Sequence, residues 1–132
     1  MKKLLLIFTL LFSTLIFSTP SYGEWTKVNS TGNGADIFYL DFERIRKHDG
    51  YVYFWTLTDS LKPTKLGHFS VKVYKQGDCK LFRQKPLSYS FHKEPMGGGT
   101  GDVAEPIGKN GDWQYLPPNS AFEEILQQVC SR

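Results

Sequence analysis

The sequence predicts an α+β fold, in which an antiparallel β-sheet is packed by a single C-terminal α-helix and held by one disulfide. Three observations lead to this prediction. Short runs of alternating aromatic and β-branched residues, separated by turn-forming residues, fill the middle of the chain. One amphipathic segment with a helix-start signal comes last. The chain contains only two cysteines, Cys79 and Cys130.

The first residues have the pattern of a secretory signal peptide. Residues 1–3 form a cationic head, and residues 4–17 form an apolar run that is shorter than the ~20 residues a membrane-spanning helix needs. Small residues precede a cleavage position after Gly23, so we expect residues 1–23 to be removed. The remaining residues 24–132 have the usual length of one domain. An uncleaved N-terminal anchor is the alternative interpretation.

This pattern predicts an exported protein that is not integral to the membrane. A bacterial lipid anchor needs a cysteine at the new N-terminus, and the first cysteine of this chain is Cys79. The sequence therefore predicts no lipid anchor, and it leaves the periplasm, the medium and the cell surface open as locations.

Two strands are predicted in the first half of the mature chain. Residues 37–42 alternate, with Phe38, Leu40 and Phe42 on one face. Residues 51–58 (YVYFWTLT) form the strongest strand signal, because nearly all of them are aromatic or β-branched. This composition favours a central position in the sheet.

The second half is predicted to contain a hairpin, an extension and a loop. Strands are expected at residues 68–75 and 80–85, with the turn at Gln76–Asp78, and residues 87–91 extend the second strand. The stretch from Pro95 to Gly108 is rich in glycine and is expected to be a mobile loop. A short strand is expected at residues 113–116, before two prolines.

The last segment is predicted to be a helix that covers the sheet. Ser120 followed by Glu123 has the spacing of a capping box. An apolar stripe then appears at the spacing of one helix face, formed by Phe122, Ile125, Leu126 and Val129.

The two cysteines are expected to pair, because an exported chain meets an oxidising environment. A bond between Cys79 and Cys130 would fasten the helix near the predicted hairpin. A catalytic thiol or a metal-ligand pair is the alternative, but the C-x-x-C spacing typical of such sites is absent.

No motif in the sequence predicts an enzyme, a cofactor or a built-in metal site. The glycine run from Gly97 to Gly101 lacks the lysine of a phosphate-binding loop and is followed by Asp102. His48, His68 and His92 are the only histidines, and their spacing matches no metal-binding motif.

The charge balance gives no case for nucleic-acid binding. The full chain carries a formal charge of +3, and removal of Lys2 and Lys3 leaves +3 − 2 = +1.

A group of cations around the predicted hairpin is the candidate ligand-binding site, which could meet polyanions such as anionic glycans or acidic protein surfaces. Its members are Lys72, Lys75, Lys80, Arg83 and Lys85. The alternative is that these side chains only protect strand edges from pairing with other chains.

A set of landmarks in order resembles one known family, the surface-adhesin protein E family. The landmarks are Trp25, Leu40-Asp41 with Ile45-Arg46, Trp55, Ser70, Asp78-Cys79, Met96-Gly97, Trp113-x-Tyr115, Pro118-x-Ser120 and Val129-Cys130. The resemblance covers almost all of the mature chain. It implies an antiparallel sheet with a C-terminal helix and bonded cysteines.

The resemblance also implies a non-enzymatic surface protein that binds host extracellular-matrix and plasma proteins such as vitronectin, laminin and plasminogen, and that can form a homodimer. The founding type of the family is held at the surface by a lipidated cysteine, which this sequence lacks before Cys79. Two hypotheses therefore stand: a binding module for a protein or polyanion, and a soluble periplasmic accessory protein without a host ligand.

Overall fold

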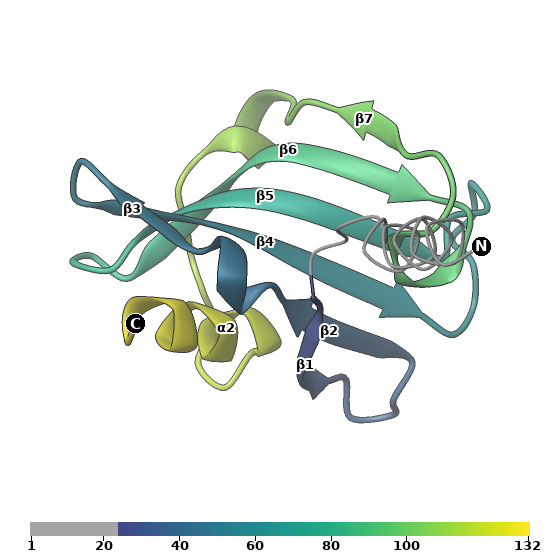
Figure 1. The fold of residues 1–132 in the computed structure, drawn as a ribbon, viewed down its shortest axis with the longest axis horizontal. Helices are drawn as coiled ribbons and strands as arrows, with labels where there is room; N and C mark the ends of the chain where they lie inside the picture. The colour runs from purple at the N-terminus through teal and green to yellow at the C-terminus, as the bar shows by residue number, and fades with distance from the viewer. Residues whose placement is uncertain (1–23) are drawn as a thin grey trace, which may run out of the picture.

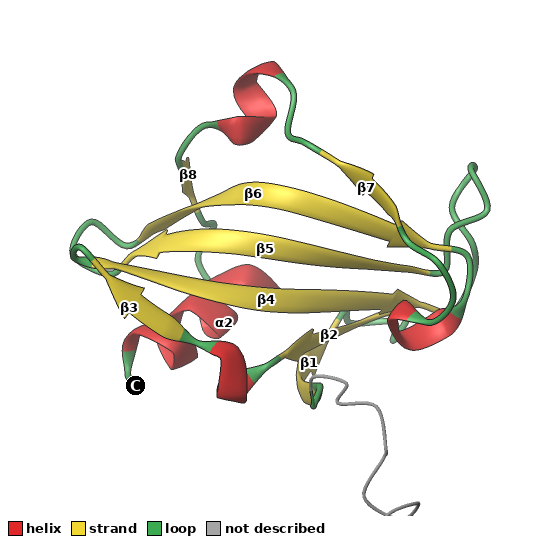
Figure 2. Cartoon of the chain, turned by 45° about the horizontal axis from the view of Figure 1, so that its top comes forward, coloured by secondary structure: helices red, strands yellow, loops and turns green. Residues whose placement is uncertain are grey.

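The computed structural model describes residues 24–132, and the predicted signal peptide lies outside the described residues. In these residues, one antiparallel sheet of eight strands carries one α-helix on a single face (Figures 1 and 2). The strands are β1 (Thr26–Ser30), β2 (Asp36–Leu40), β3 (Arg46–His48), β4 (Tyr51–Ser60), β5 (Ser70–Asp78), β6 (Arg83–His92), β7 (Asp102–Ala104) and β8 (Gln114–Tyr115). Three 3₁₀ helices, η1 (Phe42–Arg44), η2 (Pro95–Gly97) and η3 (Gly108–Gly111), precede the final helix α2 (Ala121–Cys130).

The strand order is β1-β2-β4-β5-β6-β7, while β3 pairs with β4 and β8 pairs with β6. The prediction of an α+β fold is confirmed, and so is the central place of the aromatic strand, β4. This strand pairs with β2 and β3 along one edge and with β5 along the other.

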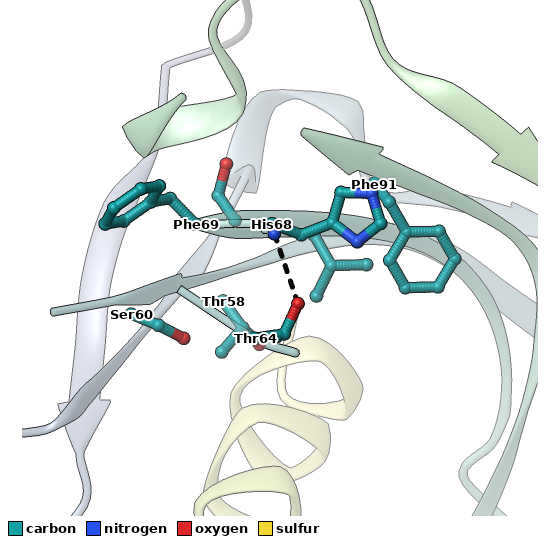
Figure 3. A pocket seen from close by; sticks show the side chains of 8 residues that line it. Thr58, Ser60, Thr64, His68, Phe69 and Phe91 are labelled. Atoms are coloured by element: carbon teal, nitrogen blue, oxygen red, sulfur yellow. Dashed lines mark hydrogen bonds between the residues drawn. The ribbon is translucent and has the colours of Figure 1, made fainter. Parts of the chain in front are cut away.

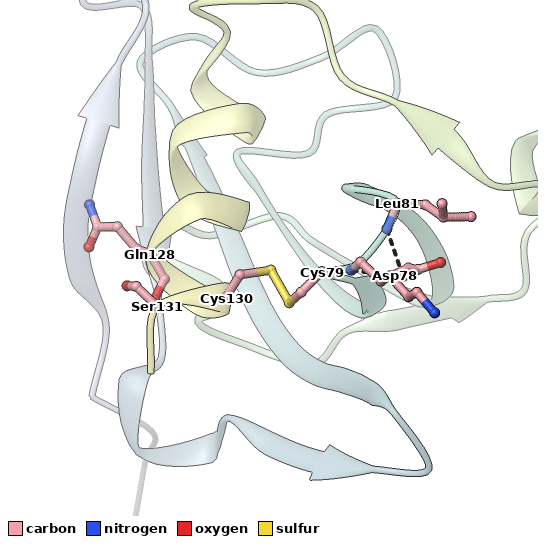
Figure 4. Close-up of a disulfide and its surroundings, with 7 residues drawn as sticks. Asp78, Cys79, Leu81, Gln128, Cys130 and Ser131 are labelled. Carbon is pink, nitrogen blue, oxygen red and sulfur yellow. Dashed lines mark hydrogen bonds between the residues drawn. A yellow bond between two sulfur atoms is a disulfide. The ribbon is translucent and has the colours of Figure 1, made fainter.

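The predicted turn at Gln76–Asp78 is wrong. Strand β5 continues to Asp78, and residues 79–82 make the turn to β6, with Phe82 at a φ of 54°. The turn forms here because the Asp78 carboxylate accepts hydrogen bonds from the N–H groups of Lys80 and Leu81, both at 3.1 Å (Figure 4).

Gly77 lies within β5, at the point where the sheet contacts helix α2. A Cβ atom at Gly77 would lie 2.8 Å from Val52 Cγ2 and 3.0 Å from Leu126 Cδ1. Only glycine therefore lets the side chains of β4 and α2 approach at this point.

Helix α2 packs on one face of the sheet, as its apolar stripe predicts. Ile125, Leu126 and Val129 are fully buried against Phe38, Leu40, Val52 and Phe54. Ser120 caps the helix by accepting the N–H of Glu123 at 3.2 Å. The Glu123 carboxylate reaches back to the N–H of Asn119, one residue before the position a capping box predicts.

The stretch from Pro95 to Gly108 is not the structureless loop that its glycines predict. It contains η2 and β7, and β7 pairs with residues 89–91 of β6.

The disulfide joins Cys79, in the turn after β5, to Cys130, the last residue of α2 (Figure 4). The two Cα atoms lie 5.6 Å apart and 51 residues apart in sequence. The bond confirms the predicted pairing and fixes the C-terminal end of the helix to the sheet.

Strand β6 has its outer edge only partly covered. Strand β8 pairs with residues 83–84 and β7 with residues 89–91, so within residues 24–132 the segment 85–88 has no strand on this side. Pro86 lies in this gap and has no N–H to offer. A register shift at Tyr74 and Lys75 of β5 places a bulge in β6 at the same point.

The Gly77→Ala substitution is expected to lower the free energy of unfolding by about 1–3 kcal/mol, because the new methyl group must displace Val52 or Leu126 in a packed core. Urea unfolding of the two proteins measures the difference. Gly32→Ala is the matched control, since a Cβ there meets no atom within 4 Å. Equal losses in the two variants would contradict the packing role of Gly77.

Candidate ligand-binding surface

The sheet face opposite α2, here called the open face, carries a chain of aromatic side chains. Side chains alternate along a strand, so Val52 and Phe54 point to the helix while Tyr53 and Trp55 point away from it. The Tyr74 ring of β5 lies between them, 6.2 Å from the Tyr53 ring and 4.9 Å from the Trp55 ring. These half-buried rings form a continuous apolar strip that the helix does not cover.

A buried aspartate fixes an arginine at one end of the strip. Asp41 is fully buried, accepts the N–H of Glu43 at 3.2 Å, and binds Nε of Arg44. The Arg44 guanidinium then lies 5.8 Å from the Trp25 ring and 5.6 Å from the Trp55 ring. Both distances are within the range of cation–π attraction.

The same arrangement recurs at the other end. Asp78 binds Nε of Arg83 at 3.0 Å, and the guanidinium carbon lies 4.5 Å from the Trp113 ring. Nζ of Lys85 lies 4.8 Å from the same ring, which stacks on Tyr51 at 5.6 Å. The Leu81 N–H, together with Arg83 and the Lys80 N–H, holds the pKa of Asp78 below its usual value although burial opposes this.

The structure separates the five cations that the sequence grouped. Arg83 and Lys85 lie together over Trp113, and Lys80 is exposed in the neighbouring turn. Lys72 also faces the open side, but nearer the other end of β5, where Gly97 lies against its side chain. Lys75 points to the helix face and is buried, so a ligand on the open face cannot reach it.

Lys75 is an unusual cation because it lies between the sheet and α2, only 5 % exposed, with Nζ 3.9 Å from the centre of the Phe122 ring. Burial lowers the pKa of Lys75 from 10.5 to about 7. The ring favours the charged form, but a cation–π contact contributes only ~0.5–2 kcal/mol, less than the cost of removing the ammonium from water. The burial of Lys75 cannot be predicted from the sequence, because it depends on Phe122, which lies 47 residues further along the chain.

The glycine-rich segment is pinned to the open face. The Met96 N–H donates to Asp59 Oδ1 at 2.8 Å, and the Gly97 N–H donates to Ser70 Oγ at 2.9 Å. His92 is 3 % exposed, and its Nδ1 donates to the Gly98 carbonyl at 3.1 Å. Two buried polar side chains, Ser70 and His92, therefore hold a segment whose composition alone predicts mobility.

A small hollow on the helix side of the sheet is a poor candidate for a ligand site. It is lined by Thr58, Thr64, His68, Val71 and Phe91, among others (Figure 3). Its volume of about 60 Å³ is far below the ~300 Å³ at which small-molecule sites begin. The His68 N–H donates to Thr64 Oγ1 at 3.1 Å across its rim (Figure 3).

No group of three or more His, Cys, Asp or Glu side chains in residues 24–132 is placed to hold a metal ion. In the same residues, no helix is both long enough and apolar enough to cross a membrane.

Comparisons with known proteins agree with this architecture. A family model described as surface-adhesin protein E matches residues 25–131. One crystal form of Haemophilus influenzae protein E is similar with a TM-score of 0.58 and 20% identity, over 86% of this chain and 91% of that chain. Protein E from non-typeable Haemophilus influenzae gives 0.54 and 19%, over 86% and 79%. No curated protein sequence matches this chain.

The burial of Lys75 predicts a pH-dependent stability. Between pH 7 and 10.5 the unfolded chain keeps a proton that folded Lys75 has lost, so the contribution of this residue to stability rises with pH. Lys75→Met is expected to stabilise the fold by a few kcal/mol at pH 6 and by less at pH 9, because each unit of pKa shift corresponds to about 1.4 kcal/mol.

Urea unfolding of parent and variant at the two pH values measures this difference. Lys80→Met, in the exposed turn, is the matched control and is expected to change little at either pH. A Lys75→Met effect that is identical at pH 6 and pH 9 would show that Lys75 does not lose its proton in the folded protein.

Proposed function

Because the chain belongs to the surface-adhesin protein E family, we propose that it is a non-enzymatic binding module of the bacterial cell envelope that recognises its ligand through the open face. The family is one of surface adhesins, which favours a binding role over a catalytic one. The ligand class we propose is a host extracellular-matrix or plasma protein, or an anionic glycan attached to one.

The observation that carries this proposal is the uncovered strip of rings and cations on the open face. Trp, Tyr and Arg are the side chains that most often dominate binding energy at protein interfaces. The two rings bury much area with few rotatable bonds, and the guanidinium offers several hydrogen-bond donors in one plane. Here Trp55 and Tyr74 lie at the centre, and Arg44 and Arg83 mark the two ends. Each arginine is held by a buried aspartate, so ordering it on binding costs little additional entropy.

The cations around the turn after β5 are proposed to steer acidic ligands. Arg83 and Lys85 lie near the surface beside Trp113, and Arg46 of β3 adds another exposed cation on the open face beside Tyr53. Such charges raise the association rate with acidic partners and make binding sensitive to salt.

Charge reversal at Arg46 and Lys85 is expected to weaken binding about 10-fold or more with only a small change in the melting temperature. Neither side chain is bound to a buried carboxylate of the described chain, and the contact of Lys85 with Trp113 is worth only ~0.5–1 kcal/mol. Binding to immobilised vitronectin, laminin and heparin is measured for Arg46→Glu/Lys85→Glu. Arg83 is left intact because its replacement would strand Asp78.

The control is Lys62→Glu/Lys65→Glu, which makes the same change of net charge in the exposed loop between β4 and β5. If both double variants weaken binding equally, net charge rather than the open face governs the interaction. If neither weakens it, the cationic end of the open face is not the site.

The location of the protein in the cell envelope tests whether it acts as a surface protein. On intact cells of the source organism, added protease is expected to digest this protein while a periplasmic control protein stays intact. Protection until the outer membrane is opened would place the protein in the periplasm. That result would replace host binding by the alternative role, a periplasmic accessory protein.

A further inference from the structure

A cleft lies on the open face at the end away from Trp113, and we propose that it binds a negatively charged sugar residue. The cleft is lined by Trp25, Arg44, Lys72 and the segment Pro95–Gly99. Its volume of about 390 Å³ is in the range of small-molecule sites and would hold one sugar ring with its substituents. The proposal rests on the function proposed above and refines it, because an acidic sugar is a component of an anionic glycan and the cleft is a separate site on the same open face.

Hydrogen bonds within the protein fix one wall of the cleft, the segment Pro95–Gly99. The Met96 and Gly97 N–H groups are bound by Asp59 and Ser70, and the Gly98 carbonyl is bound by His92. These three anchors hold the segment as a fixed wall.

Gly97 has a special part in this wall. Its φ is +69°, a conformation that glycine adopts without strain, and a Cβ there would lie 2.8 Å from Lys72 Cε. Glycine thus allows the backbone to lie directly against the lysine side chain. A cleft that is preorganised in this way loses little entropy on binding.

Two cations and no carboxylate line the cleft. Arg44 uses Nε to bind buried Asp41, and its guanidinium remains among the lining groups. Within residues 24–132, Lys72 has no ion-pair partner. The nearby carboxylate of Glu94 packs against Gly98 and Gly99 but does not line the cleft. The lining therefore favours an anionic ligand.

The aromatic wall distinguishes a sugar from a simple anion. The Trp25 ring offers a flat apolar surface of the kind on which the C–H face of a pyranose packs, while Arg44 and Lys72 would hold a carboxylate or sulfate. An inorganic anion has no apolar face to pack on the ring, and a neutral sugar offers Arg44 and Lys72 only hydroxyl acceptors, which bind cations more weakly than a carboxylate or sulfate does. The combination points to an acidic sugar such as a uronic or sialic acid.

The test uses the folded mature chain and follows the indole N–H resonances of its three tryptophans by NMR. Sodium glucuronate and N-acetylneuraminate are titrated, with glucose and sodium sulfate as comparison probes at equal ionic strength. A saturable shift of the Trp25 resonance is expected with at least one acidic sugar, with Trp113 unaffected.

Lys72→Met is expected to weaken this binding about 10-fold, the effect of losing one charge-assisted hydrogen bond. Lys85→Met is the matched control, because it removes the same charge from the other end of the open face and is expected to leave sugar binding unchanged. Heparin or protein binding that depends on Lys85 tests the function proposed above, so either site can fail alone.

Four results would overturn the proposal. They are no saturable shift at Trp25, an equal response to glucose, an equal affinity for sulfate alone, and an equal loss in Lys72→Met and Lys85→Met. The third result would identify an adventitious anion site rather than a sugar site.

Discussion

A single amphipathic helix can shield only one face of a sheet from solvent, and the rest of the structure depends on this constraint. Helix α2 buries Ile125, Leu126 and Val129 against β2 and β4, and the disulfide fixes its far end to the turn after β5. Within residues 24–132 the opposite face has no α-helix to cover it and carries only the short 3₁₀ helix η2 at one end (Figure 2). Its stability must come from side chains that shield one another, which favours large rings over aliphatic groups.

On the open face, the same arrangement of an aspartate, an arginine and a tryptophan occurs twice. A buried aspartate, Asp41 or Asp78, binds an arginine, and the arginine then lies over a tryptophan. The guanidinium satisfies the buried carboxylate on one side and the ring quadrupole on the other. The rings are thus held in place without being covered.

The sequence predicts those features that depend on neighbours in the chain. The alternation in β4, the capping serine of α2 and the spacing of its apolar stripe are local, and each appears where expected. The features it does not predict depend on contacts across the fold. The sequence places Gly77 in a turn, whereas its close approach to Leu126 explains a glycine within a strand. The sequence likewise makes Lys75 a surface cation, whereas Phe122 of α2 covers it.

The candidate site follows the same division between local and distant contacts. Tyr53 and Trp55 share a face by strand alternation alone, so the sequence predicts that these two rings of the aromatic strip lie on one side of the sheet. Its completion by Trp25, Arg44 and Trp113 needs segments that are far apart in the chain to converge. The pinned glycine segment likewise depends on Ser70 and His92, which no local pattern links to Gly97 and Gly98.

The gap in the outer edge of β6 bears on the tendency of the protein to associate strand to strand. An open row of backbone groups invites the strand of another molecule, and repeated addition of strands produces fibrils. At residues 85–88 the missing N–H of Pro86 and the bulge interrupt that row, while β7 and β8 occupy its ends. At residues 85–88 the sheet therefore offers little to the strand of a second molecule.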